Sequence, residues 1–407
     1  MKGGPSMRKH KRIPNRARQV VIMADPTLGP HIWALVDSWI ENSGPEWTAN
    51  RLKSIWNAAK HSRAGNTDLA VQVYQSEGIA YKWYADYPVP KGVYGTLTLR
   101  FILAQRPQKL KRMSTLFRLY TSIKIEDITP KQADKARNSI NMEFQGTTKY
   151  HIRKFLPRLG LPTEVQLAKP KLTKLRPYTY VYTPNPVTRD DRPYARFLRS
   201  MISVPYSPYY VGERYSPVDK FVLEELVPPM ILQLMKYEAN FPGADEHPGR
   251  IWFIQEAGAK ARVVAQPCAY LQFALQPAQE YLDRLISTKE EICVHDQNRG
   301  AYFSIRAMEE GIEAYCFDLS SATDRFPLFF QQDLLDFMGL ESVSASLEQL
   351  SRDPWIVPQL NNEEWSYHVG QPMGLVVSFP LFSLAHWALI KACELNLEDQ
   401  GYSPTRV

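Results

Sequence analysis

Residues 317–327 read Phe-Asp-Leu-Ser-Ser-Ala-Thr-Asp-Arg-Phe-Pro, a stretch that carries two carboxylates, Asp318 and Asp324. The run before it, residues 313–317, is short, mostly apolar and rich in strand-forming side chains, which predicts a buried strand with Asp318 at its end. A carboxylate in that position costs free energy unless it is neutralised, and a divalent metal ion is a common partner. We therefore expect Asp318 to bind a metal ion. Asp324 follows a turn, where helix capping is the default interpretation of an aspartate.

A loop bounded by two glycines follows later in the chain. Residues 370–374 read Gly-Gln-Pro-Met-Gly, and a helical stripe of leucine and alanine begins a few positions beyond them. Gly370 and Gly374 allow backbone conformations that a side chain would forbid. Ser378 precedes Pro380 at the start of this stripe, so it is predicted to cap the helix, a role that is compatible with a polar contact to a ligand.

Two strand-like runs, residues 250–256 and 260–265, lie upstream of the 317–327 segment on either side of a turn of small residues, which predicts a hairpin. Lys260 and Arg262 stand at alternate positions and are expected to project on the same side. Cations in that arrangement can neutralise a triphosphate. An ordinary surface hairpin is the alternative that these residues alone leave open, and Glu256 could pair with either cation.

Together, the three segments resemble motifs F, A and B of a viral RNA-dependent RNA polymerase, in that order along the chain. The closest resemblance is to the mitovirus polymerases, within the group that includes narnaviruses and RNA phage replicases. The whole 317–327 stretch and its place between the other two segments are more specific than a pair of aspartates. Residues 47–53 and 127–132 also look like the amino-terminal region of this family.

The resemblance implies a right-hand polymerase fold of the α+β class and an RNA-directed nucleotidyltransferase. It implies that Asp318 binds Mg²⁺ or Mn²⁺ in a two-metal site, and that Asp324 senses the ribose 2′-hydroxyl. The residues that the resemblance places on the incoming nucleotide are Lys260, Arg262, Asp324 and Ser378. Those that it places in a loop beside the template are Gly370, Gln371 and Gly374.

The Gly-Asp-Asp motif that these polymerases carry after motif B does not occur in the sequence. Asp190 and Asp191 are adjacent, but they precede the 317–327 segment and lack a glycine and apolar flanks. We therefore expect an incomplete metal site, no thumb and no synthesis by the chain alone. The chain is then a truncated or relic polymerase, or one half of a divided one whose partner polypeptide carries motifs C to E. A catalytically inactive, polymerase-derived RNA-binding or interaction protein is the alternative.

The composition describes a chain that can bury a large core, with 407 residues of which 44% are hydrophobic. The formal net charge is +7, and residues 1–24 hold seven lysines and arginines without an acid. This basic arm could bind phosphate backbones, act as a transit-like segment or be a solvated tail.

The four cysteines have no paired spacing, which argues against a disulfide framework or a zinc site. No apolar run approaches the length of a membrane span, so we expect an intracellular chain, mitochondrial if the mitovirus likeness holds and otherwise cytoplasmic.

Three parts are expected along the chain. Residues 1–170 form the basic arm and a helical amino-terminal extension, because apolar residues recur there at helical spacing. Residues 171–305 form the fingers, which begin in a stretch rich in proline and tyrosine that excludes helix over most of residues 177–217. Residues 306–407 form an incomplete palm. The expected partners are the viral RNA template and product, and nucleoside triphosphates.

Overall fold

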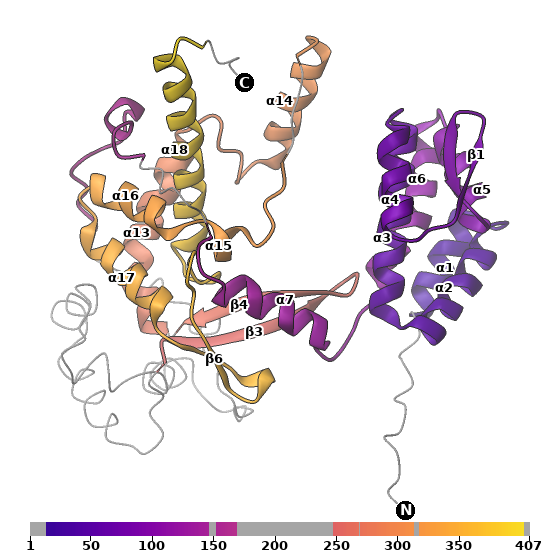
Figure 1. Cartoon of the computed structure of the whole chain (residues 1–407), viewed down its shortest axis with the longest axis horizontal. Helices are drawn as coiled ribbons and strands as arrows, with labels where there is room; N and C mark the ends of the chain where they lie inside the picture. The colour runs from indigo at the N-terminus through magenta and orange to yellow at the C-terminus, as the bar shows by residue number, and fades with distance from the viewer. Residues whose placement is uncertain (1–13, 146–151, 169–246, 268, 313–316, 403–407) are drawn as a thin grey trace, which may run out of the picture. The chain divides into compact units, whose positions relative to one another are not determined.

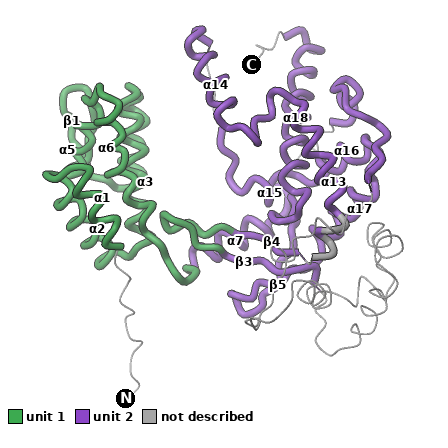
Figure 2. The backbone as a smooth tube through the Cα atoms, turned by 180° about the vertical axis from the view of Figure 1, so that it is seen from behind, with its two compact units in different colours: residues 1–129, 254–262 green, residues 130–253, 263–407 purple. Residues whose placement is uncertain are grey.

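The computed structural model describes residues 14–145, 152–168, 247–267, 269–312 and 317–402 (Figure 1). These residues form a mixed α+β fold that is mostly helical and has two small sheets in its described part. The chain divides into two compact units, with residues 1–129 and 254–262 in unit 1 and residues 130–253 and 263–407 in unit 2 (Figure 2). The expected α+β class is confirmed. The predictions for residues 1–13 and 177–217 fall outside the described residues.

Unit 1 is a helical body that carries one small hairpin. Its elements are α1 (Asn15–Ala24), α2 (Gly29–Ser43), α3 (Pro45–Arg63), α4 (Thr67–Ser76), β1 (Tyr81–Tyr84), β2 (Tyr87–Pro90), α5 (Val93–Ile102), α6 (Pro107–Phe117) and the 3-10 helix η1 (Arg118–Ser122). The helices expected in this region are confirmed, whereas the antiparallel β1–β2 pair was not predicted. Strand β2 is largely buried, so packing rather than local pattern maintains it.

Aromatic side chains hold the core of unit 1 together. Trp56 on α3 lies 5.1 Å from the ring of Phe101 and 5.0 Å from the ring of Phe117, centroid to centroid. The turn into α2 is fixed by Asp25, whose Oδ1 accepts hydrogen bonds from the backbone amides of Thr27 and Leu28. Its Oδ2 pairs with Arg100 at 2.7 Å. Helices distant in sequence are thereby joined around one apolar centre.

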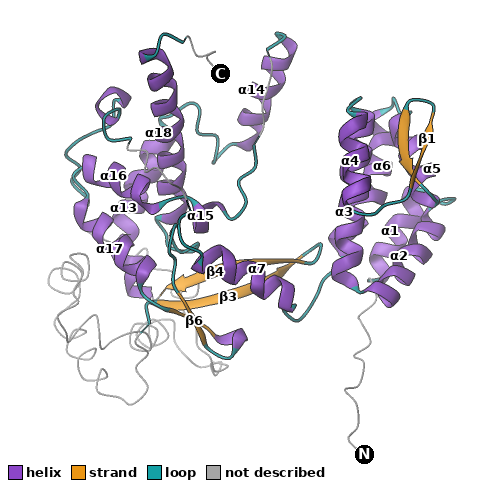
Figure 3. Cartoon of the chain, in the orientation of Figure 1, coloured by secondary structure: helices purple, strands orange, loops and turns teal. Residues whose placement is uncertain are grey.

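Unit 2 combines a sheet with a group of packed helices (Figure 3). Its elements are α7 (Pro130–Asn141), the 3-10 helix η2 (Leu156–Leu159), β3 (Gly249–Glu256), β4 (Lys260–Pro267), α13 (Ala269–Ser287), α14 (Gln297–Glu309), α15 (Ala322–Arg325), α16 (Leu328–Phe337), α17 (Glu341–Arg352), β5 (Trp355–Val357), the 3-10 helix η5 (Pro358–Leu360), β6 (Glu363–Trp365) and α18 (Ser378–Asp399). The tip of the β3–β4 hairpin, residues 254–262, belongs to unit 1. The strand order is β4-β3-β5-β6. β3 runs parallel to β5, and β5 antiparallel to β6.

The core of unit 2 forms around α18, which packs against α13 and α16. Most of its leucines and alanines at the helical spacing expected from the sequence are fully buried, among them Leu381, Leu384 and Ala388. Small alanine side chains let neighbouring helices approach closely, so α18 can be covered on several sides. No helix in the described ranges has both the length and the apolar character required to span a bilayer.

Candidate functional site

The 317–327 segment begins in an exposed, irregular stretch. Residues 313–316 of the expected strand lie outside the described residues, and Phe317 is neither in a strand nor buried, with 88% of its surface exposed. The burial expected for Phe317 is therefore wrong, because within the described ranges nothing covers its ring. Asp318 is exposed too, and it has no hydrogen-bond or ion-pair partner among the residues that the structure describes.

Asp324 lies inside the short helix α15, in a more enclosed setting. Its Oδ2 accepts a hydrogen bond of 3.2 Å from the hydroxyl of Ser139 on α7. Burial raises the pKa of Asp324 to about 6, against the opposite effects of the Ser139 hydrogen bond and the Arg325 charge. Tyr367 is fully buried, and its burial, together with the charge of Asp324, raises the pKa of the phenol. No side chain caps α15, so helix capping is not the role of Asp324.

The 370–374 loop is paired with α15 through its backbone. The amide of Gly370 donates to the carbonyl oxygen of Asp324 at 3.0 Å, and the amide of Gln371 donates to that of Thr323 at 3.0 Å. A Cβ at Gly370 would lie 2.0 Å from the Thr323 oxygen, far inside van der Waals contact. Glycine is therefore required at this position by the approach of the two main chains.

The second glycine of the loop meets strand β4 in the same way. Gly374 has φ +142°, and a Cβ there would lie 1.8 Å from the carbonyl oxygen of Ala265. The amide of Ala265 donates to the Met373 oxygen at 2.8 Å. Gln272 on α13 completes the joint by donating to the Gly374 oxygen at 2.7 Å. Both loop glycines thus serve close contacts between protein segments.

The side chain of Gln371 is fully buried and points into the protein. Its Nε2 donates to Gln331 Oε1 at 2.5 Å and to the Ser378 carbonyl oxygen at 3.2 Å. Ser378 is the first residue of α18, the chain enters through Val377 in a helical conformation, and no side chain caps the helix. The predicted Ser378 cap is therefore wrong. Its Oγ is buried and has no hydrogen-bond partner in the described part of the chain.

The predicted hairpin is confirmed as β3 and β4. Lys260 and Arg262 are both exposed at alternate positions of β4. Arg262 Nε donates to Glu256 Oε1 at 2.8 Å, and a second guanidinium nitrogen reaches Oε2 at 3.3 Å, so the expected Glu256 pairing is found. The tip is held in unit 1, because Lys53 Nζ donates to the Gly258 oxygen at 2.7 Å. Lys260 has no such partner among the residues described.

The described carboxylates do not form a metal site by themselves. No group of three or more histidine, cysteine, aspartate or glutamate side chains in the described ranges is arranged to hold a metal ion. Asp318 is a single exposed oxygen donor, whereas Mg²⁺ in a polymerase-type site takes carboxylates from more than one segment. The residues present therefore fit part of such a site and not a whole one.

Comparison with known proteins shows which family the segments of this site resemble. Residues 212–401, which include the hairpin, the 317–327 segment and the 370–374 loop, match the family model of the mitovirus RNA-dependent RNA polymerase. This part of the chain is therefore similar to the mitovirus polymerases. It is 30% identical over 149 residues to the RNA-directed RNA polymerase of Cryphonectria parasitica mitovirus 1, a match that covers 36% of this chain and 18% of that protein.

A second relative is an uncharacterized mitochondrial protein of Arabidopsis thaliana. It is 29% identical over 86 residues, which is 20% of this chain and 42% of the plant protein. The chain therefore aligns with less than half the length of either curated relative. No solved structure matches the chain.

Several residues around the mitovirus-like segments were not foreseen from the sequence. They are Ser139, Gln272, Gln331 and Tyr367. Each lies tens of positions from the segment that it contacts and carries no motif of its own. A search for polar residues inside otherwise apolar helical stripes would have marked Gln331 and Gln272, which are both buried. Only the folded chain shows which partners they meet.

Proposed function

We propose that this chain forms the nucleotide-binding and palm-forming part of a viral RNA-directed RNA polymerase. The observation that carries the proposal is the backbone pairing of the 370–374 loop with α15, in segments that both lie within the match to the mitovirus family. It brings an enclosed carboxylate, Asp324, beside a loop whose glycines tolerate no side chain. In this assignment residues 1–170 are an amino-terminal extension, 171–305 the fingers and 306–407 part of the palm.

The proposed roles come from the family resemblance, and the position of each side chain supports them. Asp318 is exposed and unpaired in the described part of the chain, so it is accessible as one carboxylate ligand for Mg²⁺ or Mn²⁺. Lys260 and Arg262 share one face of the hairpin and neutralise the triphosphate of the incoming nucleotide. Asp324 accepts a hydrogen bond from the ribose 2′-hydroxyl, which distinguishes RNA from DNA precursors. Ser378 contributes its unpaired hydroxyl to the same sugar-recognising region.

The remaining metal ligands come from a Gly-Asp-Asp polypeptide, whether it continues this chain or is a separate molecule. The incomplete donor set of the described residues supports this requirement. The mitovirus family and the mitochondrial relative favour a mitochondrial site of action. A catalytically inactive RNA-binding protein derived from a polymerase is the competing function, and the same experiment decides between the two.

The experiment measures incorporation of labelled nucleotides on an RNA template with Mg²⁺ or Mn²⁺. The purified 407-residue chain is expected to give no product alone, and to give product when a Gly-Asp-Asp-containing polypeptide of the same virus is added. Asp318→Asn is expected to remove nearly all turnover and leave RNA affinity unchanged, because only the chemistry loses a charged ligand. Synthesis by the chain alone would remove the requirement for the added polypeptide. Failure to synthesise under both conditions, with RNA binding intact, would favour the inactive RNA-binding protein.

Sugar recognition gives a second readout in the same assay. Asp324→Ala is expected to narrow the preference for ribonucleotides over deoxyribonucleotides by on the order of tenfold, the value of one hydrogen bond to a charged group. The measurement is kcat/KM for matched nucleotide pairs. An unchanged ratio in a folded variant would place the ribose contact on another residue.

A further inference from the structure

One face of unit 1 carries many cations, and Glu126 is the one acid among the residues that line its cavity. The segments 14–24 and 103–125 contain no aspartate or glutamate, and in the fold α1 packs against α6 and η1, so that the two segments form one surface. Its cations are Arg16, Arg18, Arg106, Lys109, Lys111, Arg112, Arg118 and Lys124, and all of them are exposed. We call this surface the α1–α6 face.

The cations of the α1–α6 face differ from other arginines of the same unit. Arg51 and Arg63 donate to backbone carbonyl oxygens, and Arg100 pairs with Asp25. By contrast, no side chain in the eight-cation set has an ion pair or hydrogen bond with another described residue. Like charges that no ion pair neutralises raise the free energy of the folded chain, and binding of an anion relieves that repulsion.

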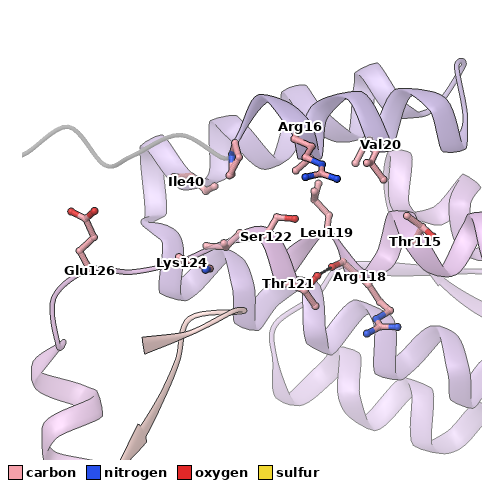
Figure 4. A pocket seen from close by; sticks show the side chains of 14 residues that line it. Arg16, Val20, Ile40, Thr115, Arg118, Leu119, Thr121, Ser122, Lys124 and Glu126 are labelled. Atoms are coloured by element: carbon pink, nitrogen blue, oxygen red, sulfur yellow. Dashed lines mark hydrogen bonds between the residues drawn. The ribbon is translucent and has the colours of Figure 1, made fainter. Parts of the chain in front are cut away.

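A cavity of about 710 Å³ lies within this face, between α1 and the segment around η1 (Figure 4). Three of the cations, Arg16, Arg118 and Lys124, line it, and Figure 4 shows Arg16 reaching from α1 toward Leu119 on η1. The hydroxyl of Ser122 also lines the cavity and has no partner among the described residues. The volume falls in the range of small-molecule sites, so one nucleotide unit can enter.

The interior of this cavity is apolar. Val21 and Ile123 are each 2% exposed and Leu119 is 3% exposed, and all three contribute to its lining. A ligand that fits must therefore offer an anionic group to the cations and a flat, weakly polar group to the aliphatic interior. A nucleotide of a single strand offers both, because its base is free to leave the stack.

We propose that the α1–α6 face binds single-stranded RNA, with phosphates on Arg16, Arg118 and Lys124 and one base inserted against the aliphatic lining. Duplex RNA does not satisfy the cavity, because its bases are paired and stacked within the helix. The lining has no aromatic ring, so the contact is expected to tolerate any base. None of these residues lies within the 212–401 match, and the site goes beyond the proposed polymerase chemistry.

The test is binding of fluorescently labelled single-stranded RNA to the full chain, measured by anisotropy across a salt series. In the triple variant Arg16→Gln, Arg118→Gln and Lys124→Gln, affinity at about 50 mM salt is expected to fall about tenfold or more. The slope of log affinity against log salt is expected to become shallower by about two, because each lost phosphate contact removes about 0.7. The matched control removes three exposed cations elsewhere, as Lys82→Gln, Lys91→Gln and Lys135→Gln. Its slope is expected to stay near that of the unaltered chain.

A cavity-filling variant tests base insertion separately from charge. Ala17→Trp fills the space and keeps every cation, so it is expected to abolish the preference for single-stranded over duplex RNA while retaining binding to both. Val20→Trp, at a position that is 46% exposed, repeats the test if the first variant melts early in circular dichroism. Equal losses in the two triple variants would overturn the proposal, as would no preference for single strands in the unaltered chain. Binding to vesicles with acidic headgroups but not to RNA would overturn it in favour of a membrane surface.

Discussion

The carboxylate of Asp324 accepts a hydrogen bond from Ser139 and lies near the buried phenol of Tyr367, whose pKa is raised by burial and by that charge. Enclosure of a carboxylate favours its neutral form. The same enclosure suits the sugar-recognising role that we propose for Asp324, because a hydrogen bond to a 2′-hydroxyl is strongest where water is excluded. Holding the charged form of Asp324 in this enclosed position therefore lowers the stability of the fold.

The first prediction concerns the pH dependence of stability. The folded pKa of Asp324 is about 6 against an ordinary value of 3.8, so its stabilising contribution is fully present below 3.8 and is lost as the pH rises through 6. Asp324→Asn should remove this loss. At pH 7.5 the free energy of unfolding of the variant should exceed that of the unaltered chain by up to about 3 kcal/mol, and solvent screening of the charge makes the difference smaller. Urea unfolding of both proteins at pH 4 and at pH 7.5 measures this difference in unfolding free energy. Identical pH profiles for the two proteins would contradict the argument, and exposed Asp86→Asn is the control.

The second prediction concerns Gly370. Gly370→Ala brings a Cβ within 2.0 Å of the Thr323 oxygen, which forces the 370–374 loop away from α15 and breaks two backbone hydrogen bonds. We expect a loss of about 3–5 kcal/mol, from about 1 kcal/mol for each hydrogen bond and about 1–3 kcal/mol of steric strain.

Gly401→Ala is the matched control, because that glycine has positive φ and open space around it. It should cost about 1–2 kcal/mol through its backbone conformation alone. Denaturant unfolding compares the two variants. Equal losses would mean that the loop and α15 do not hold each other in place.

At the scale of elements, local patterns predicted what depends on neighbours in sequence. The strand-like runs at 250–256 and 260–265 predicted the hairpin, and the apolar period after Ser378 predicted α18. The Ser378 cap failed for a tertiary reason. The helix begins at that residue because the loop before it is tied to β4 and α13, which leaves no extended residue to act as a cap.

Contacts between distant segments were beyond any local pattern. The glycines of the 370–374 loop were correctly marked as special, but their partners, Thr323 and Ala265, have ordinary side chains and act through main-chain atoms. A contact made by main-chain atoms does not restrict the side chain of the partner residue, so the sequence does not reveal the partner. The exposure of Phe317 was missed because an apolar run predicts a strand without saying whether another segment covers it.

The third prediction concerns the hairpin. Arg262 pairs with Glu256 at an exposed site, where such a pair contributes little to stability, so a triphosphate can replace the carboxylate. Arg262→Ala should raise the nucleotide KM about tenfold in a reconstituted enzyme and leave RNA affinity largely intact. Steady-state kinetics and RNA anisotropy measure the two effects, with Lys82→Ala as control. If the variant instead loses RNA affinity while its nucleotide KM is unchanged, the hairpin binds RNA and not the nucleotide.

At the scale of the whole molecule, the described residues contain two separate apolar clusters. One gathers the helices of unit 1 together with Ala259 from the hairpin tip, and the other gathers α13, α16, α17 and α18 in unit 2. Each cluster is large enough to act as the core of its own cooperative unit. The β3 and β4 strands contribute residues to both units.

The fourth prediction is that the two cores unfold separately. Leu52 and Leu384 are fully buried, one in each cluster. Leu52→Ala and Leu384→Ala should each cost about 2–5 kcal/mol, and each should lower the temperature of one calorimetric transition while leaving the other in place. A single transition shifted equally by both changes would show that the two units fold as one.

The close approach of Gly374 to Ala265 also has a consequence for the interpretation of related gene sequences. A Cβ at position 374 would lie 1.8 Å from a main-chain oxygen, so no exchange of the alanine side chain relieves the collision. Natural selection for the intact loop therefore acts on position 374 whatever the neighbouring side chains become. A gene copy that retains glycine there still encodes the joint between loop and strand. In a copy with any other residue, either β4 has shifted or the fold is no longer under selection.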